Sequence, residues 1–401
     1  MKAVGVIAEY NPLHNGHVHH LEQARLAAEA DAVVVAMSGD FVQRGEPAIM
    51  DKWTRTEHAL KSGADLVIEI PVLFCLGNAR QYAEAAVRLL EATGKVSGIA
   101  FGSESGDAEA LTQTAVTLRE HHDEIGKLTA ELQRKGLSYP AARAAAYAEV
   151  VKAVSDGVPG IPEQPNDILA IEYIRAMRTA EPVVIKREGA GYGDPFENGK
   201  SYQSASAIRS MVFDGQDVSS HVPSHVAAAI RERHLSGPDT DKWFDALRYA
   251  VLSADTESIE DCPSGGEGLA NLMKREAASA VSWTDLIKRI KSKRYTYTRL
   301  SRLCSQLLLG ITRSRYDIGE PGYIRVLGFS ERGRQLLAEI RDEGCAELPV
   351  LININKNADD PGENAVKLLG LDVHAADIYN LMTDSGLEEG SDHRRAPVIV
   401  K

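Results

Sequence analysis

The sequence contains little cysteine and no segment that could cross a membrane. Its four cysteines are scattered along the 401 residues, at Cys75, Cys262, Cys304 and Cys345. This spacing argues against a disulfide framework or a zinc site and is typical of reduced thiols in a cytoplasm. No apolar run is long enough to span a bilayer, and the N-terminus lacks the pattern of a signal peptide. We therefore expect a cytoplasmic protein with no membrane partner.

An excess of positive charge is also missing. The formal net charge is −12 at pH 7, which argues against a general affinity for polyanions, because nucleic-acid binding depends on neutralising phosphates. No glycine-rich dinucleotide fingerprint (GxGxxG) follows the first apolar run, which argues against a dehydrogenase. Hydrophobic residues make up 44% of the chain, enough for a globular protein of two or three domains.

Short apolar runs alternate with amphipathic segments through the first half of the chain. The runs expected to form buried strands are Ala3–Glu9, Ala32–Met37, Leu66–Ile70, Gly98–Phe101 and, later, Pro182–Lys186. The segments expected to form helices between the first four are centred on His17–Glu29, Lys52–Ser62 and Arg80–Thr93. Unbroken apolar strands separated by helices predict right-handed crossovers and a Rossmann-like parallel sheet. The predicted fold class is α/β.

The pattern changes near Pro223, after which helices are expected as far as Leu309. Two further strands are expected at Tyr323–Leu327 and Pro349–Ile354, followed by a polar and mobile tail from Thr383. We predict three parts: a sheet domain over residues 1–222, a mainly helical region over 223–320, and a small mixed α/β segment with a mobile tail over 321–401.

The turn after the first strand is suited to a nucleotide. In VGVIAEYNPLHNGH the strand ends near Glu9, and a helix opens at His14. Free backbone amides and the helix dipole favour anions at such a position. Gly16 permits close approach of a ligand, and His14 and His17 can donate hydrogen bonds to phosphate oxygens as charge develops. A capped helix with incidental histidines is the alternative, but the position directly after the first strand favours a nucleotide site.

A second turn, later in the chain, agrees with the first. Ser204 and Ser206 open a helix after a late strand, and Arg209 adds positive charge, so this turn suits terminal phosphates. An ordinary serine N-cap is the alternative. Together the two turns resemble the HxGH nucleotidyltransferase superfamily, in which a T/HxGH turn and an SxSxxR-like turn hold opposite ends of ATP.

Two charged segments lie outside these turns. The loop Ser38–Pro47 follows the second strand, and its polarity predicts a substrate-facing loop. Lys52 and Arg55, on the next helix, either meet pyrophosphate or tRNA or lie on a solvated helix face.

A basic patch interrupts the acidic chain, with no acidic residue from Lys288 to Arg302. Tyr295 and Tyr297 lie between the cations and could stack on unpaired bases. A solvated helix face is the alternative, but helix faces seldom lack acidic residues so completely. The candidate RNA contacts are Lys288, Arg289, Lys291, Lys293, Arg294, Tyr295, Arg299 and Arg302.

Eight sequence runs carry a more specific resemblance. In order along the chain they are VGVIAEYNPLHNGH, MSGDFVQRGEPA, ADLVIEIP, FGSE, NDILAIEYI, IKREGAGY, SYQSASAIR and KRYTYTRLSR. The series resembles the bacterial tRNA(Met) cytidine acetate ligase family over nearly the whole chain. The resemblance implies an enzyme that activates acetate with ATP to acetyl-adenylate, releasing pyrophosphate, and then acetylates N4 of the wobble cytidine in elongator tRNA(Met). Residues 1–222 would be the ATP-binding domain and residues 223–320 the RNA-binding region.

The resemblance also implies site residues, with His14 and His17 as the catalytic pair. It adds Gly102, Asn166 and Arg187 to the N-terminal loop, although the residues alone favour a helix N-cap for Asn166. With the serine turn, the predicted ATP-binding set is Ile7, Ala8, Glu9, Tyr10, Asn11, Pro12, Leu13, His14, Asn15, Gly16, His17, Val18, His19, His20, Gly102, Asn166, Arg187, Ser204, Ser206 and Arg209. No metal ligand in the chain is predicted; Mg²⁺ is expected with the triphosphate.

Two other functions stay open from the residues. One is a small-molecule adenylyltransferase with a phosphate-bearing acceptor, against which stands the length of chain beyond Pro223. The other is a tRNA-binding module with a relict nucleotide site.

Overall fold

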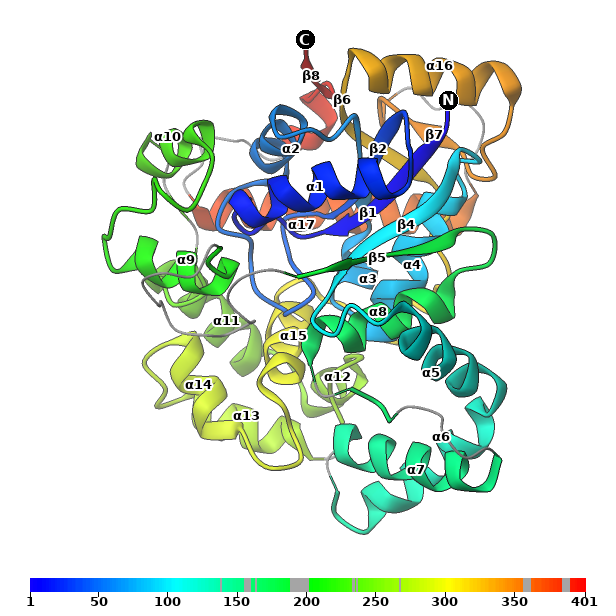
Figure 1. The fold of residues 1–401 in the computed structure, drawn as a ribbon. Helices are drawn as coiled ribbons and strands as arrows, with labels where there is room; N and C mark the ends of the chain where they lie inside the picture. Colours follow the sequence, from blue (N-terminus) through cyan, green and yellow to red (C-terminus); the bar gives the residue numbers. More distant parts are fainter. Residues whose placement is uncertain are drawn as a thin grey trace.

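The structure is a computed structural model. It describes residues 1–137, 139–154, 160–162, 164–187, 202–232, 235, 237–266, 268–355, 362–383 and 390–401. A twisted sheet crosses the molecule, with helices packed on both of its faces and a helical region (α11–α15) below it in the view of Figure 1.

Within the described residues the sheet has eight strands, in the order β5-β4-β1-β2-β3-β6-β7, with β8 paired to β6. The strands are β1 (Ala3–Ala8), β2 (Ala32–Ser38), β3 (Leu66–Ile70), β4 (Val96–Ser103), β5 (Glu181–Lys186), β6 (Ile324–Ser330), β7 (Val350–Leu351) and β8 (Val398–Val400). Strands β1 to β5 are parallel, and β6 is antiparallel to β3. The predicted α/β class and the Rossmann-like parallel sheet are confirmed.

The helices of the sheet region include the three that were predicted around His17–Glu29, Lys52–Ser62 and Arg80–Thr93. Up to β5 they are α1 (Asn15–Ala27), α2 (Lys52–Lys61), α3 (Val72–Cys75), α4 (Ala79–Glu91), α5 (Ala108–Glu120), α6 (His122–Arg134), α7 (Tyr139–Val154) and α8 (Pro165–Ala176). After β5 come α9 (Ala205–Phe213), α10 (Ser224–Glu232), α16 (Glu331–Glu343), α17 (Glu363–Thr383) and α18 (Ser391–Arg394). None of the helices in the described part of the chain has the length and apolar composition of a membrane span.

The two faces of the sheet bury separate hydrophobic cores. Successive side chains of a strand point to opposite faces, so Ala3 faces α4 and α8, whereas Val4 faces α1 and α9. Tyr173 of α8 lies in the first core and Ile208 of α9 in the second. Helices α4 and α8 therefore approach any ligand at the strand ends from one face, and α9 approaches it from the other.

The middle of the chain is helical, as predicted. Its helices are α11 (Asp241–Ser253), α12 (Thr256–Asp261), α13 (Leu269–Ala277), α14 (Trp283–Ile290) and α15 (Tyr297–Leu308). They enclose a third core around Leu247, Trp283 and Leu300, all fully buried. The division of the chain at residues 222 and 320 stays a prediction.

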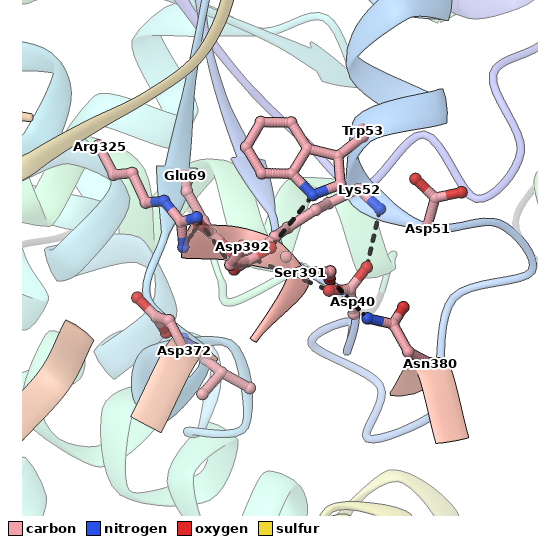
Figure 2. Close-up of polar contacts among 12 residues, drawn as sticks. Asp40, Asp51, Lys52, Trp53, Glu69, Arg325, Asp372, Asn380, Ser391 and Asp392 are labelled. Atoms are coloured by element: carbon pink, nitrogen blue, oxygen red, sulfur yellow. Dashed lines mark hydrogen bonds and ion pairs between the residues drawn. The ribbon is translucent and has the colours of Figure 1, made fainter. Parts of the chain in front are cut away.

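The C-terminal residues differ from the expected mobile tail. Residues 384–389 lie outside the described part, but β8 pairs with β6, and Asp392 of α18 is buried. Asp392 Oδ2 lies 2.6 Å from Lys52 Nζ and 2.9 Å from Arg325 Nη2, as Figure 2 shows. The polar composition of the C-terminal residues had suggested exposure to solvent. Their burial could not be read from that composition, because Lys52 and Arg325, which pair with Asp392, are distant in the sequence.

Candidate active site

A pocket lies where the carboxyl ends of β1, β4 and β5 meet α1, α8 and the start of α9. The strand order reverses between β1 and β4, the point at which open α/β sheets hold their ligands. Of the predicted ATP-binding set, the pocket is lined by Ile7, Ala8, Glu9, Tyr10, Asn11, His14, Gly16, His17, His19, His20, Gly102, Asn166, Arg187 and Ser204. The structure thus brings together five segments of the sequence: the N-terminal turn and the segments around Gly102, Asn166, Arg187 and Ser204.

Six predicted residues do not line the pocket: Pro12, Leu13, Asn15, Val18, Ser206 and Arg209. Several of them support it instead. Leu13 is fully buried in the core beneath α1. Asn15 Nδ2 donates to Ser220 O at 3.1 Å, and Arg209 Nη1 donates to Asn11 O at 2.8 Å. These contacts hold the turn in place from outside.

The two predicted catalytic histidines are held by the backbone of their own turn. His14 is the N-cap of α1, and its Nδ1 accepts from Gly16 N at 3.1 Å. The Nδ1 of His17 accepts from His14 N at 3.3 Å, and the two rings stack with centroids 3.7 Å apart. Because both Nδ1 atoms accept, each neutral ring must carry its proton on Nε2. Both rings therefore present an N–H donor at Nε2.

Burial keeps these histidines neutral. Burial, with a smaller effect of the Arg187 charge, lowers the pKa of His14 to about 3. Burial and the neighbouring His14 lower the pKa of His17, and burial lowers that of His20 to about 4. At neutral pH the rings are uncharged donors, and a bound anion would be their natural partner.

Buried polar atoms in the pocket also lack partners. Among the described residues nothing hydrogen-bonds to Tyr10 Oη, Asn11 Nδ2 or His20 Nε2, and all three residues line the pocket. A buried polar group without a partner costs free energy, and such groups are rare in native structures. Their concentration here indicates a polar ligand.

The side of the pocket at β4 is built by reciprocal contacts between the FGSE turn and α8. Asp167 accepts from Ser103 Oγ at 2.5 Å and from Glu104 N at 3.0 Å. Glu104 in turn accepts from Asn166 Nδ2 at 2.5 Å, which leaves the amide oxygen of Asn166 for a ligand. The N-cap of α8 is Gln164, so the N-cap interpretation of Asn166 was wrong. A Cβ on Gly102 would lie 3.0 Å from the Arg187 side chain.

At the α9 side of the pocket, one residue fits both interpretations of the serine turn, as a phosphate site and as a helix N-cap. Ser204 is the N-cap of α9, and its Oγ accepts from Ala207 N at 3.2 Å, yet it also lines the pocket. The outer parts of two predicted motifs, residues 188–192 and 201, lie outside the described residues.

The comparisons with known proteins agree over the full length of the chain. Residues 1–394 match the family model of the HIGH nucleotidyl transferases. The chain is 33% identical over 414 residues to the tRNA(Met) cytidine acetate ligase of Clostridium perfringens strain SM101, covering 100% of both. It is 36% identical over 422 residues to that of Syntrophotalea carbinolica, covering 100% of this chain and 99% of the relative. This chain belongs to the tRNA(Met) cytidine acetate ligase family.

The solved structures similar to this chain come from the same family. Apo Thermotoga maritima TmcAL has a TM-score of 0.91 at 32% identity, with 100% of both chains covered. TmcAL bound with alpha-thio ATP has a TM-score of 0.88 at 32% identity, with 100% of this chain and 99% of that chain covered.

In this member of the family, neither predicted role of Lys52 and Arg55 is correct. Both side chains are buried, so they lie on no solvated face, and neither lines the pocket. Lys52 Nζ pairs with Glu69 at 2.8 Å. Arg55 donates to the backbone carbonyls of Glu9 at 2.7 Å and Ser38 at 3.0 Å. These contacts tie α2 to the ends of β1 and β2, and Arg55 supports the loop rather than touching a substrate.

The loop Ser38–Pro47 faces the pocket, as predicted. Gln43 and Arg44 line it, and Gln43 N donates to Glu9 Oε1 at 2.9 Å. The lining residues that were missed include Tyr82 of α4 and Tyr173 of α8. Their only signal was an aromatic residue on the apolar face of a helix, which is typical of any core.

The basic patch divides into exposed and buried parts. Its exposed members are Lys288, Arg289, Lys291, Lys293 and Arg294. The proposed stacking role of Tyr295 was wrong, because its ring is only 8% exposed and packs in the helical core beneath Arg299. Arg299 donates to the carbonyls of Ser264 and Gly265, both at 3.1 Å.

Helix α15 joins this basic patch to the pocket loop. Arg302 Nη1 reaches Gln43 O at 3.4 Å, and Ser301 Oγ donates to Gly45 O at 2.9 Å. Gly45 has a φ of +84°, and a Cβ there would lie 2.2 Å from Arg302 N, so only glycine fits. Tyr297 Oη donates to Glu46 at 3.3 Å. The inner end of the patch therefore supports the loop rather than facing solvent.

Proposed function

We propose that this protein activates acetate with ATP and transfers the acetyl group to N4 of the wobble cytidine of elongator tRNA(Met). The observation that carries the proposal is the pocket itself, in which neutral histidine donors and unpaired polar atoms converge at the switch point of the sheet. The names of the full-length relatives and the alpha-thio ATP bound to TmcAL support the choice of substrates.

ATP would lie across the pocket with its α-phosphate at the histidine pair. The Nε2–H groups of His14 and His17 would face the α-phosphate, because their Nδ1 atoms are already engaged. Asn166 and Arg187, beside Gly102, would meet the adenosine, and Ser204 at the start of α9 would meet the terminal phosphates. The start of α9 suits that role because the dipole and first-turn amides of a helix favour anions at its N-terminus.

The first step would be an in-line displacement at phosphorus. A carboxylate oxygen of acetate forms a bond to the α-phosphorus while the bond to the bridging oxygen of the β-phosphate breaks. The electron pair leaves with pyrophosphate, and no proton needs to move. His14 and His17 stabilise the negative charge that develops on the α-phosphate oxygens, and their fixed tautomers hold the donors ready.

The second step would use the acetyl-adenylate as an acyl donor. The exocyclic amine of cytidine is a poor nucleophile because its lone pair is delocalised into the ring, and acetate alone has no good leaving group. The amine attacks the acetyl carbon, the bond to the AMP oxygen breaks, and N4 loses a proton. The exposed cations Lys291, Lys293 and Arg294 would contribute affinity for the tRNA backbone.

Mg²⁺ would be held mainly by the triphosphate. Within the described residues no group of three His, Cys, Asp or Glu side chains is placed to hold a metal ion. The histidine, amide and hydroxyl groups of the pocket suit phosphate oxygens instead, and Mg²⁺ usually keeps few protein ligands beside a nucleotide. When bound, the ion would neutralise the charge on the β- and γ-phosphates.

The test is mass spectrometry of tRNA nucleosides after incubation with ATP and isotope-labelled acetate. We expect labelled N4-acetylcytidine in elongator tRNA(Met) and none when ATP or acetate is left out. A dinucleotide formed from a phosphate-bearing acceptor would instead show a small-molecule adenylyltransferase. Salt-dependent tRNA binding without ATP turnover would show a binding module.

A further inference from the structure

The lining of the pocket includes residues with no assigned contact to the α-phosphate, the adenosine or the terminal phosphates. Six of them are here called the inner arm: Glu9, Arg44, Tyr82, Phe101, Leu169 and Tyr173. Phe101, Tyr82 and Tyr173 belong to the core beneath α4 and α8, whereas α9 packs on the opposite face of the sheet. The inner arm and the start of α9 thus meet at the end of β1 from opposite faces.

The opposite positions of the inner arm and the start of α9 match the geometry of the proposed reaction, so the inference rests on the proposed function. In phosphoryl and adenylyl transfer, the entering and leaving oxygens lie roughly in line on opposite sides of the phosphorus. With the α-phosphate at His14 and His17 and pyrophosphate toward α9, the entering nucleophile comes from the face of α4 and α8. The inner arm is the part of the pocket on that face.

The inner arm places one hydroxyl group beside aromatic side chains. The hydroxyl of Tyr173 has no hydrogen-bond partner among the described residues, although only 6% of the residue is exposed. The neighbouring Tyr82 hydroxyl is engaged with Ser38 Oγ at 3.3 Å. The rings of Phe101 and Tyr173 lie 5.9 Å apart and close the arm with an apolar wall. One open donor beside an apolar wall suits a carboxylate with a short alkyl group.

The charges around the inner arm favour the binding of an anion. The guanidinium groups of Arg44, Arg209 and Arg55 are near enough to Glu9 to lower its pKa, against the larger opposite effect of burial. A second carboxylate, Glu46, lies 3.9 Å from Arg209, and Arg302 adds a fourth guanidinium beside Arg44. Among these described side chains around Glu9 and Arg44, four guanidinium groups stand against two carboxylates, which favours one further negative charge.

We propose that the inner arm is the acetate site, with the carboxylate of acetate held by the Tyr173 hydroxyl and Arg44 and its methyl group against Phe101. Tyr173 and Arg44 touch the substrate and orient one carboxylate oxygen toward the α-phosphorus. Phe101 sets the specificity, because a longer alkyl chain would collide with its ring.

The experiment is acetate-dependent exchange of labelled pyrophosphate into ATP, without tRNA. The substitution Tyr173→Phe removes one hydrogen bond to a charged ligand, so the KM for acetate should rise about tenfold while the KM for ATP stays unchanged. Ser204→Ala, on the opposite face, should show the reverse pattern. Tyr316→Phe, which removes a hydroxyl from a half-buried ring outside the pocket, is the matched control and should change neither constant.

A second variant tests the specificity wall. Phe101→Leu should increase the exchange rate with propionate relative to acetate by about tenfold or more, the scale set by one methylene in an apolar pocket. An unchanged acetate KM in the Tyr173 variant together with an unchanged propionate preference in the Phe101 variant would overturn the acetate site. In that case wild-type exchange still depends on acetate. Wild-type protein that shows no acetate-dependent exchange would overturn the proposed function and the acetate site together.

Discussion

Two buried polar regions of this protein lie on different strands of the same sheet, with β2 between them, and are built in opposite ways. The nucleotide pocket, at the ends of β1 and β4, holds neutral histidines and polar atoms that find no hydrogen-bond partner among the described residues. The ion cluster, defined here as Lys52, Glu69, Arg325 and Asp392, holds two cations and two anions paired with one another. Buried charges that pair with one another indicate a structural element. Buried polar groups without partners among the described residues indicate a binding site.

The ion cluster joins four elements that are remote in the sequence. Lys52 comes from α2, Glu69 from β3, Arg325 from β6 and Asp392 from α18. Figure 2 shows them converging, with Trp53 Nε1 donating to Asp392 Oδ1 at 3.1 Å. Burial alone would raise the pKa of Asp392, but Lys52 and Arg325 lower it to about 2. The cluster holds the C-terminal segment against the sheet.

The largest effect is expected from breaking the cluster. Asp392→Asn removes the negative charge shared by Lys52 and Arg325 and keeps the side-chain volume. Removing one partner of a buried ion pair typically costs about 3–5 kcal/mol, because a buried charge is left uncompensated. We expect a loss of this size in the free energy of unfolding, measured by urea denaturation.

The matched control for Asp392 is an exposed ion pair. Glu331→Gln breaks a surface pair with Arg334 and should leave the free energy of unfolding unchanged within error, since such pairs contribute little. If Asp392→Asn and Glu331→Gln reduced the free energy of unfolding equally, the buried ion cluster would contribute no more to stability than an exposed ion pair.

The second largest effect is expected from the pocket. His17→Ala removes one of the two donors assigned to the α-phosphate, and we expect acetate-dependent pyrophosphate exchange to slow by roughly 10²-fold, as on loss of one oxyanion donor. The control is His122→Ala, since His122 is exposed on α6. A near-normal rate for the His17 variant would remove this histidine from the catalytic set.

A third effect is expected in the pH dependence of stability. The pKa of His20 is lowered from 6.5 to about 4 by burial, so between these values the unfolded chain binds a proton that the folded protein does not. Stability should therefore fall as the pH decreases from 6.5 toward 4, by at most about 1.4 kcal/mol per pH unit for one such group.

The variant His20→Gln should reduce this acid dependence. Urea denaturation at several pH values should give a shallower fall in the free energy of unfolding below pH 6.5 than in the wild type. An identical slope would mean that His20 binds its proton at the same pH in the folded and unfolded states, which would contradict the burial effect on its pKa.

The smallest effect is expected from the exposed cations of the basic patch. Lys291→Ala with Lys293→Ala removes two exposed cations of the basic patch. The affinity for tRNA should weaken, and the slope of log K against log[salt] should fall by about 1 for each phosphate that the variant no longer neutralises. Lys61→Ala with Lys367→Ala, two exposed lysines elsewhere, is the charge-matched control. Equal slopes in the two double variants would exclude the patch as the RNA surface.

Much of the fold was predictable because its signals are local. A strand buried on both faces needs an unbroken apolar run, and the runs that begin at Ala3, Ala32 and Leu66 form β1, β2 and β3. The short strand Val398–Val400 was missed because three residues carry no periodicity of their own. It forms only because β6 offers an edge for it.

The sequence by itself determined the sheet and the turn between β1 and α1. The residues His14, Gly16 and His17 act within one turn, so their geometry follows from neighbours in the chain. Only the tertiary structure decided the rest. The fold buries Lys52 and Tyr295, for which the sequence had suggested contacts with a substrate, and it places Tyr173 in the lining of the pocket. The physical reason is that burial and charge pairing depend on contacts between residues far apart in the sequence, and local patterns do not contain those contacts.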